Sequence, residues 1–127
     1  MANNLTYQDF AMDEARYLVD AYSKGLRYNA MVSQAQRVCE CYMKHIINKR
    51  MLNNSEVMVS HNLRVLYEHL ENMGLDMREA RTDIMLLNNF YTHTRYPGKD
   101  AFMASEEDIT AAVDAIARLV KFFTRYC

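Results

Sequence analysis

Four side chains that suit anion or nucleobase recognition lie close together near residue 95. Tyr91, His93, Arg95 and Tyr96 fall within six positions, directly before a Pro-Gly pair. An arginine guanidinium matches the geometry of a phosphate, and aromatic rings stack on bases. The pattern therefore indicates a phosphate or nucleotide contact. The alternative is structural: the tyrosine and proline pack a turn, and Arg95 caps the preceding helix.

Basic residues also gather between residues 27 and 54, where five of them oppose one acid, a local charge of +4. Arg37 and Lys44 in this segment are seven positions apart, so they share one face of a helix. Such a basic face can meet a phosphate or an acidic partner. It can equally be an ordinary solvated face.

His61 lies near the start of a further predicted helix. There it could cap the helix or form a hydrogen-bonded part of the core. An imidazole can also change its charge near neutral pH, which would make His61 a switchable partner for an anion. The sequence leaves these roles open.

The usual metal-binding and catalytic patterns are missing. A di-metal carboxylate bundle needs a glutamate three residues before a histidine, and none of the four histidines has one. Cys39 and Cys41 would lie about 200° apart around a helix, so they cannot chelate one zinc ion. There is no glycine-rich phosphate loop. We therefore expect neither a metal site nor a cofactor.

Long amphipathic helices must position these residues, because only three glycines and one proline interrupt the chain. The apolar spacing predicts five of them, at about 6–25, 28–51, 56–73, 77–93 and 105–126. Their short connections favour antiparallel neighbours. The predicted fold class is all-α, an antiparallel up-and-down bundle of four to five helices. It forms a single domain over residues 1–127, with its core at about 6–126.

Two helix starts carry a recognisable signal. Thr6 with Asp9, and Ser105 with Asp108, resemble capping boxes. Residues expected to face the core include Phe10, Val19 and Val59.

The composition favours a cytoplasmic globular protein. The net charge of −1 gives no reason to expect tight binding to bulk nucleic acid or to membranes, and no apolar run approaches 18 residues. The first residues lack the pattern of a signal peptide. Three cysteines with no repeated spacing argue against a disulfide framework and for a reducing compartment.

The order of these motifs resembles the HEPN family of small helical nucleotide-binding domains, over roughly residues 6–126. The motifs that carry the resemblance are Gln34-Ala35-x-Arg37-Val38 leading to Lys44, His61-Asn62-Leu63-x-x-Leu66, and Tyr91-x-x-x-Arg95-Tyr96-Pro97.

The resemblance implies a four- or five-helix bundle that commonly forms homodimers. Small bacterial members are often encoded beside minimal nucleotidyltransferases, in arrangements that resemble toxin–antitoxin pairs. In the resembling family the histidine that matches His61 lies near the Arg-Tyr-Pro loop, which implies an imidazole facing Arg95. Many relatives are metal-independent ribonucleases with an Arg-x4-6-His motif at a dimer cleft.

The chain departs from that ribonuclease motif. Arg95 is followed by Asp100, Ala101 and Phe102 at the three spacings where a histidine is required. The only literal match is Arg64-x4-His69, whose residues would sit about 140° apart around one helix. A complete ribonuclease motif is therefore not expected.

Three functional hypotheses follow. The first is a non-catalytic or weakly catalytic homodimer that binds a nucleotide, an RNA phosphate or a nucleotidyltransferase-type partner. The second is a metal-independent endoribonuclease, for which Arg64 and His69 are the catalytic candidates. The third is a helical protein-interaction module with a surface rich in Met and Tyr. The candidate binding residues of the first hypothesis are Arg95, Tyr96, His61, Arg37, Lys44, Tyr91 and His93.

Overall fold

The computed structural model describes residues 4–127. Over this range the chain forms six α-helices and a short 3₁₀ turn, with no strand, which confirms the predicted all-α class. None of these helices is long and apolar enough to cross a membrane. The elements are α1 (Tyr7–Ser23), α2 (Ala30–Lys49), α3 (Ser55–Met58), α4 (Leu63–Asn72), η1 (Arg78–Ala80), α5 (Arg81–Thr94) and α6 (Glu106–Thr124).

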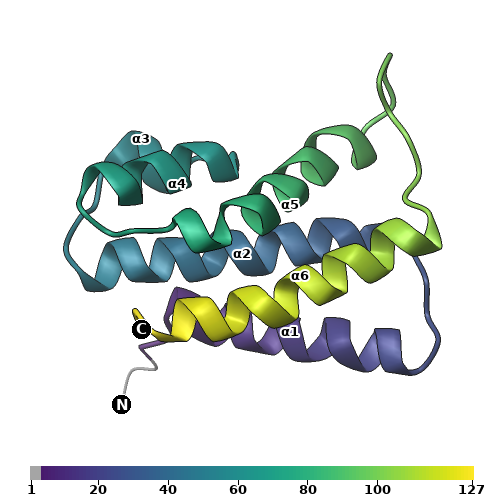
Figure 1. The fold of residues 1–127 in the computed structure, drawn as a ribbon, viewed down its shortest axis with the longest axis horizontal. Helices are drawn as coiled ribbons and strands as arrows, with labels where there is room; N and C mark the ends of the chain where they lie inside the picture. Colours follow the sequence, from purple (N-terminus) through teal and green to yellow (C-terminus); the bar gives the residue numbers. More distant parts are fainter. Residues whose placement is uncertain (1–3) are drawn as a thin grey trace.

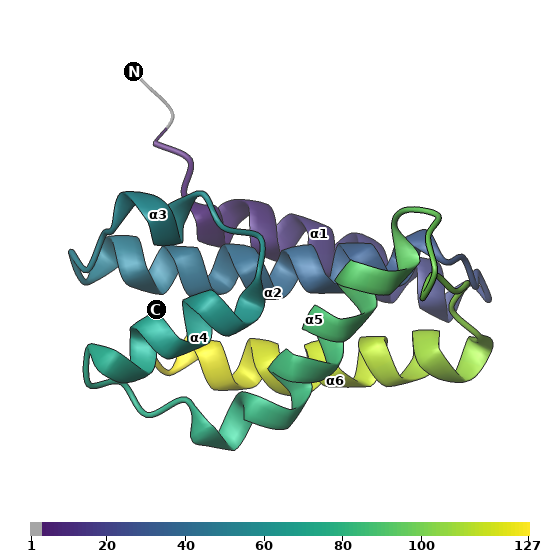
Figure 2. The same ribbon diagram turned by 90° about the horizontal axis from the view of Figure 1, so that it is seen from above.

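Helix α2 is the centre of the bundle and packs against α1, α4, α5 and α6. Helices α1 and α2 are antiparallel neighbours, and α6 runs beside them (Figure 1). Helix α5 crosses this group obliquely, and the short α3 and α4 cover one end of α2, as Figure 2 shows from above. Because α2 has neighbours on most sides, it supplies much of the core.

The core consists mainly of aliphatic and aromatic side chains from the longer helices. Met43, Ile46 and Ile47 of α2 are fully buried. The ring of Tyr42 stacks on that of Phe123 from α6, with centroids 5.7 Å apart. Burying such side chains stabilises a fold by about 1.5–3 kcal/mol each, so α2 and α6 are firmly held together.

Both predicted capping boxes are confirmed. The Thr6 hydroxyl accepts a hydrogen bond from the Asp9 amide at 3.2 Å, and the Asp9 carboxylate accepts one from the Thr6 amide at 2.8 Å. Ser105 and Asp108 repeat this arrangement at 3.1 and 2.9 Å. These boxes set where α1 and α6 begin.

The prediction of one continuous helix over residues 56–73 is wrong. The chain instead forms α3 and α4 with an irregular connection at residues 59–62. The side chain of Asn62 accepts a hydrogen bond from the Arg64 amide at 3.0 Å and so starts α4 afresh. Val59 falls in the connection and is 73% exposed, so it does not face the core as expected.

Two predicted core residues of α1 are also exposed. Phe10 is 50% and Val19 is 47% accessible, whereas Ala11, Leu18 and Ala21 are buried. The reason is that α1 lies at the edge of the bundle and packs chiefly against α2. A single neighbouring helix buries only a narrow stripe of α1. The apolar residues of α1 form a wider stripe, so those at its edges, Phe10 and Val19, remain exposed.

Candidate functional site

A groove of about 740 Å³ runs along one side of α2, between α1 and the end of α5. We call it the α2 groove. It contains most of the predicted binding residues. The residues that line it are Tyr7, Glu14, Ala30, Ser33, Gln34, Gln36, Arg37, Glu40, Cys41, His61, Tyr91, Arg95 and Tyr96.

Arg95 lies at the end of this groove, directly after α5. Its guanidinium carbon is 4.6 Å from the centroid of the Tyr91 ring and 5.5 Å from that of Tyr96. Aromatic faces attract a cation and hold it in place without using its N–H groups. None of the ion pairs found among residues 4–127 involves Arg95. Its hydrogen-bonding groups therefore remain available to an anion.

A second set of polar groups lies beneath the groove, on α2 itself. We call Gln36, Glu40 and Lys44 the α2 ladder, because they follow one another at intervals of four residues. All three are buried. The Lys44 ammonium donates to Glu40 Oε2 at 2.9 Å, and the Gln36 amide donates to Glu40 Oε1 at 3.2 Å. Glu40 therefore has a partner on each of its two oxygens.

His61 is attached to the α2 ladder at two points. Its Nδ1 lies 3.0 and 3.2 Å from the two oxygens of Glu40, and its carbonyl accepts a hydrogen bond from Gln36 at 2.9 Å. Most of the ring is nevertheless exposed, and its centroid is 6.2 Å from that of Tyr91. His61 and Arg95 thus both pack against Tyr91 in one groove.

The charge state of Glu40 follows from these contacts. Burial would raise the pKa of its carboxyl, but hydrogen bonds from Lys44, His61 and Gln36 outweigh burial and lower it. An ionised carboxylate only accepts hydrogen bonds, so Nδ1 of His61 carries the proton that is donated to Glu40. The other ring nitrogen, Nε2, makes no hydrogen bond within residues 4–127 and can meet a ligand.

Arg37 is less available than Arg95. Its Nε lies 3.1 Å from Oε2 of Glu14, which neutralises part of its charge. The two side chains are close enough for an ion pair but are not aligned for a hydrogen bond, since this Glu14 oxygen is buried and has no hydrogen-bond partner. Burial accordingly raises the pKa of Glu14, against the opposing effect of Arg37. A ligand that reaches Arg37 must compete with Glu14.

The prediction that Arg37 and Lys44 form one exposed basic face is wrong. Arg37 is exposed, but Lys44 is only 5% accessible and its ammonium is paired with Glu40. Lys44 does not line the α2 groove. Its place in the structure is beneath His61, where it stabilises the carboxylate that holds the imidazole.

A second cleft, of about 540 Å³, lies against the loop of residues 95–103; we call it the loop cleft. Its lining includes Arg95 and Tyr96, which it shares with the α2 groove. His93 lies here and not in the α2 groove. Its ring stacks on that of Phe102 with centroids 6.3 Å apart.

The loop itself is fastened by the side chain of Asn29. Its Nδ2 donates to the Thr94 carbonyl at 2.9 Å, and its Oδ1 accepts from the Ala104 amide at 2.7 Å. Asn29 is also the residue before α2, yet its side chain does not cap that helix. The Phe102 amide donates to the His93 carbonyl at 2.9 Å. The two ends of the loop, which projects from the bundle in Figure 1, are thereby held together.

The literal ribonuclease match lies elsewhere. Arg64 and His69 both belong to α4, and neither lines the α2 groove. His69 Nε2 donates to the Leu52 carbonyl at 2.6 Å, which gives this imidazole a structural partner.

Gln36 and Glu40 are the site residues that were missed from the sequence. A signal for them was present: Gln36, Glu40 and Lys44 are polar residues at a spacing of four within one helix. The spacing of four places the three residues on one face of α2, where a buried polar chain can form.

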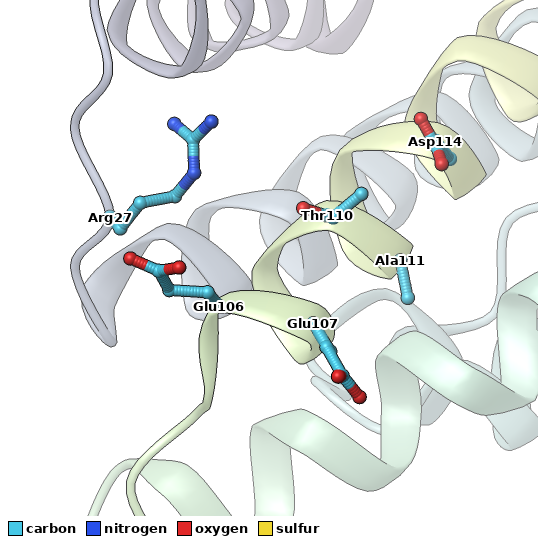
Figure 3. A pocket seen from close by; sticks show the side chains of 6 residues that line it. All are labelled: Arg27, Glu106, Glu107, Thr110, Ala111 and Asp114. Carbon is cyan, nitrogen blue, oxygen red and sulfur yellow. The ribbon is translucent and has the colours of Figure 1, made fainter.

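A further depression, of about 470 Å³, lies where the connection between α1 and α2 meets the start of α6 (Figure 3). The carboxylates of Glu106, Glu107 and Asp114 point in different directions there. The guanidinium carbon of Arg27 lies 3.7 Å from the centroid of the Tyr22 ring. Among the described residues, no cluster of three or more His, Cys, Asp or Glu is arranged to hold a metal ion. This depression offers no converging set of ligands.

The fold and the groove define a small all-α domain in which a central helix carries a polar site that is completed by an Arg-Tyr-Pro loop. The sequence pattern of the HEPN domain matches residues 9–126. The chain therefore belongs to the HEPN domain family, which confirms the resemblance of its motifs. No curated protein and no solved structure matches the chain.

Proposed function

We propose that this HEPN domain binds the phosphate of a nucleotide or of RNA in the α2 groove. The observation that carries the proposal is the state of Arg95, which is held over two tyrosine rings and has no acidic partner among the described residues. A guanidinium in this state suits a phosphate, and the rings of Tyr91 and Tyr96 suit a base.

The other groove residues have graded roles in this proposal. With both ring nitrogens protonated, His61 can donate from Nε2 to the anion as a second contact, since Nδ1 is occupied by Glu40. Arg37 is a weaker contact because of its pairing with Glu14. Lys44 acts indirectly, by holding Glu40 and through it His61.

A titration of labelled ATP, GTP and a short RNA tests the proposal. A hydrogen bond to a charged group contributes about 1.5–3 kcal/mol, so Arg95→Ala should weaken binding by about 10- to 150-fold. Arg81→Ala is the matched control, because Arg81 is an exposed arginine that lies over a tyrosine ring outside the groove. Equally weak binding by wild type and Arg95→Ala for every ligand would remove the nucleotide hypothesis.

A metal-independent endoribonuclease is the second candidate. One observation favours it: the pairing of Glu40 with His61 orients an imidazole in the groove that Arg95 also lines. In such a pair the carboxylate fixes the ring, and Nε2 can accept a proton from an attacking hydroxyl. The sequence argues against it, because no histidine follows Arg95 at the motif spacing.

Incubation of RNA with the protein and a chelator decides between these functions. If His61 is the acid–base group, His61→Ala abolishes cleavage and His69→Ala does not. Loss of cleavage in His69→Ala alone would assign the activity to Arg64 and His69. Intact RNA with the wild-type protein would leave binding as the function.

We further propose that the protein is a homodimer joined through α1. The supporting observation is that α1 exposes Phe10 and Tyr17 at 50% and 60%, and these two residues are seven positions apart and so lie on one face of the helix. Contiguous apolar surface of this kind favours association. Light scattering on the purified protein should give twice the chain mass, and Phe10→Glu with Tyr17→Glu should give a monomer. A monomeric wild type would exclude the dimer.

The family also suggests a partner of the minimal nucleotidyltransferase type, in a cytoplasmic toxin–antitoxin-like arrangement. Coexpression with a minimal nucleotidyltransferase tests this proposal. Copurification that nucleotides alter would support a shared site. Copurification that nucleotides do not affect would favour the alternative, a helical interaction module.

A further inference from the structure

We propose that the ligand is a single-stranded oligonucleotide that crosses the loop of residues 95–103, which we call the Arg95 loop. One base occupies the α2 groove, the next occupies the loop cleft, and the linking phosphodiester lies at Arg95. This inference rests on the proposed function and specifies its ligand class: at least two nucleotides rather than a free mononucleotide.

The two clefts meet at the same residues. Arg95 and Tyr96 line both the α2 groove, of about 740 Å³, and the loop cleft, of about 540 Å³. Small-ligand sites commonly measure about 300–1,000 Å³, so each cleft is large enough for one nucleotide. A ligand that fills both must pass over Arg95.

Each cleft presents aromatic rings of its own. In the α2 groove they include those of Tyr91 and His61, with centroids 6.2 Å apart. In the loop cleft they are those of His93 and Phe102, at 6.3 Å and an interplanar angle of 29°. Aromatic side chains on which successive bases stack are characteristic of single-strand binding, and such stacking tolerates any base.

The charges fit a chain that has one phosphate between two bases. The loop cleft has no acidic residue in its lining. The two acids of the α2 groove are each paired with a cation, Glu14 with Arg37 and Glu40 with Lys44. Arg95, at the junction, is paired with no acid in the described part of the chain. The cation without an acidic partner thus lies where the linking phosphate would be.

The loop that separates the clefts is already in place. Asn29 joins Thr94 to Ala104 across its base, and Phe102 is bonded to His93 within it. A preformed loop lowers the entropic cost of binding, because less of the chain has to be ordered. Both clefts are therefore available together without rearrangement.

The test compares ApA with adenosine 5′-O-methyl phosphate, which carries the same single negative charge but only one base. Calorimetric titration of the wild type should show ApA binding about tenfold more tightly, since a stacked base contributes about 1–3 kcal/mol. A parallel titration of d(ApA) shows whether the chain must be RNA.

Two variants locate the second base. Phe102→Leu keeps an apolar side chain against Phe90 but removes the aromatic face, so ApA should lose its advantage while the one-base ligand is unchanged within twofold. Met103→Ala is the control, because Met103 lines the same cleft without a ring and is largely exposed. Tyr91→Ala should weaken both ligands, since it removes a ring from the α2 groove.

Failure of this inference is distinct from failure of the proposed function. Equal binding of both ligands, or a Phe102→Leu variant that retains the tenfold preference, would overturn the two-cleft ligand and leave a mononucleotide site. Loss of both ligands together in Phe102→Leu would also overturn it. No binding of either ligand by the wild type would contradict the phosphate site itself.

Discussion

The α2 ladder and the Arg95 loop both hold charged groups at or beneath the α2 groove, but the two regions differ in whether those charges are paired. Glu40 and Lys44 of the ladder are buried and paired with each other. Arg95 is exposed, lies on aromatic rings and is paired with no acid among residues 4–127. Both regions touch the site, but only one of them has hydrogen-bonding capacity left for a ligand.

This difference indicates that the ladder positions the residues of the site and that the loop recognises the ligand. A buried ion pair is costly to break, because the remaining charge has no water to solvate it. An exposed cation costs little to remove from the folded chain, but its loss is felt by any anion that it binds. Substitutions in the ladder should therefore change the free energy of unfolding, and substitutions in the loop should change binding.

The largest effect is expected for Glu40→Ala. The substitution leaves the Lys44 ammonium buried without a partner and frees the His61 ring, so the free energy of unfolding should fall by about 3–5 kcal/mol. Urea denaturation followed by circular dichroism measures this loss. In the control, Glu40→Leu with Lys44→Met, no charge remains buried and most of the stability should return. A loss below about 1 kcal/mol in Glu40→Ala would contradict the structural role of the ladder.

A smaller effect is expected from acid. The folded pKa of Glu40 lies below the ordinary value of 4.5, so the folded state holds fewer protons than the unfolded state. The stabilisation by Glu40 is therefore complete above about pH 4.5 and is lost as pH falls through the lowered folded pKa. Denaturation of wild type and Glu40→Gln over pH 3–7 should show the stability difference shrinking only in that acidic range. One proton bounds the slope at about 1.4 kcal/mol per pH unit. A difference that is constant with pH would show that Glu40 is not the titrating group.

Sequence reasoning predicted the helices better than the site. Capping boxes and apolar periodicity are local, so Thr6 and Ser105 were identified as helix starts and the helices were assigned to an all-α bundle. The break before α4 was missed, because it depends on a single capping residue, Asn62, within a continuous apolar pattern. Val59 was wrongly assigned to the core for the same reason.

Only part of the site was predicted, because its members come from distant segments of the chain. Periodicity indicates the face of a helix, but it does not tell whether a charge on that face meets solvent or a neighbouring element. Lys44 illustrates this limit: it was expected to be exposed, but packing of the neighbouring segments buries it beside Glu40. The bonds from Asn29 to Thr94 and Ala104 span 65 and 75 residues and have no local signature.

A moderate effect confined to the loop is expected for Asn29→Ala. The substitution removes both bonds across the base of the loop, each of which contributes about 0.5–1.5 kcal/mol. Hydrogen exchange should accelerate at the Ala104 and Phe102 amides, while the amides of α2 and α6 stay protected. Asn29→Asp is the matched control, since its carboxylate still accepts from Ala104 although it cannot donate to Thr94. Equal acceleration at Ala104 in both variants would argue against a direct bond from residue 29.

The smallest effect on stability is expected for Arg95→Ala. Its contacts to Tyr91 and Tyr96 are exposed cation–π interactions, each of which contributes about 0.5–1 kcal/mol, so the free energy of unfolding should change by no more than about 2 kcal/mol. The same substitution should nevertheless produce the largest loss of phosphate binding, because no neighbouring cation can replace it without competing with an acid. Arg95→Lys keeps the charge but not the planar fork, and should retain part of the binding. If Arg95→Ala instead destabilised the protein as strongly as Glu40→Ala, Arg95 would belong to the structural network, and the distinction between the two regions would fail.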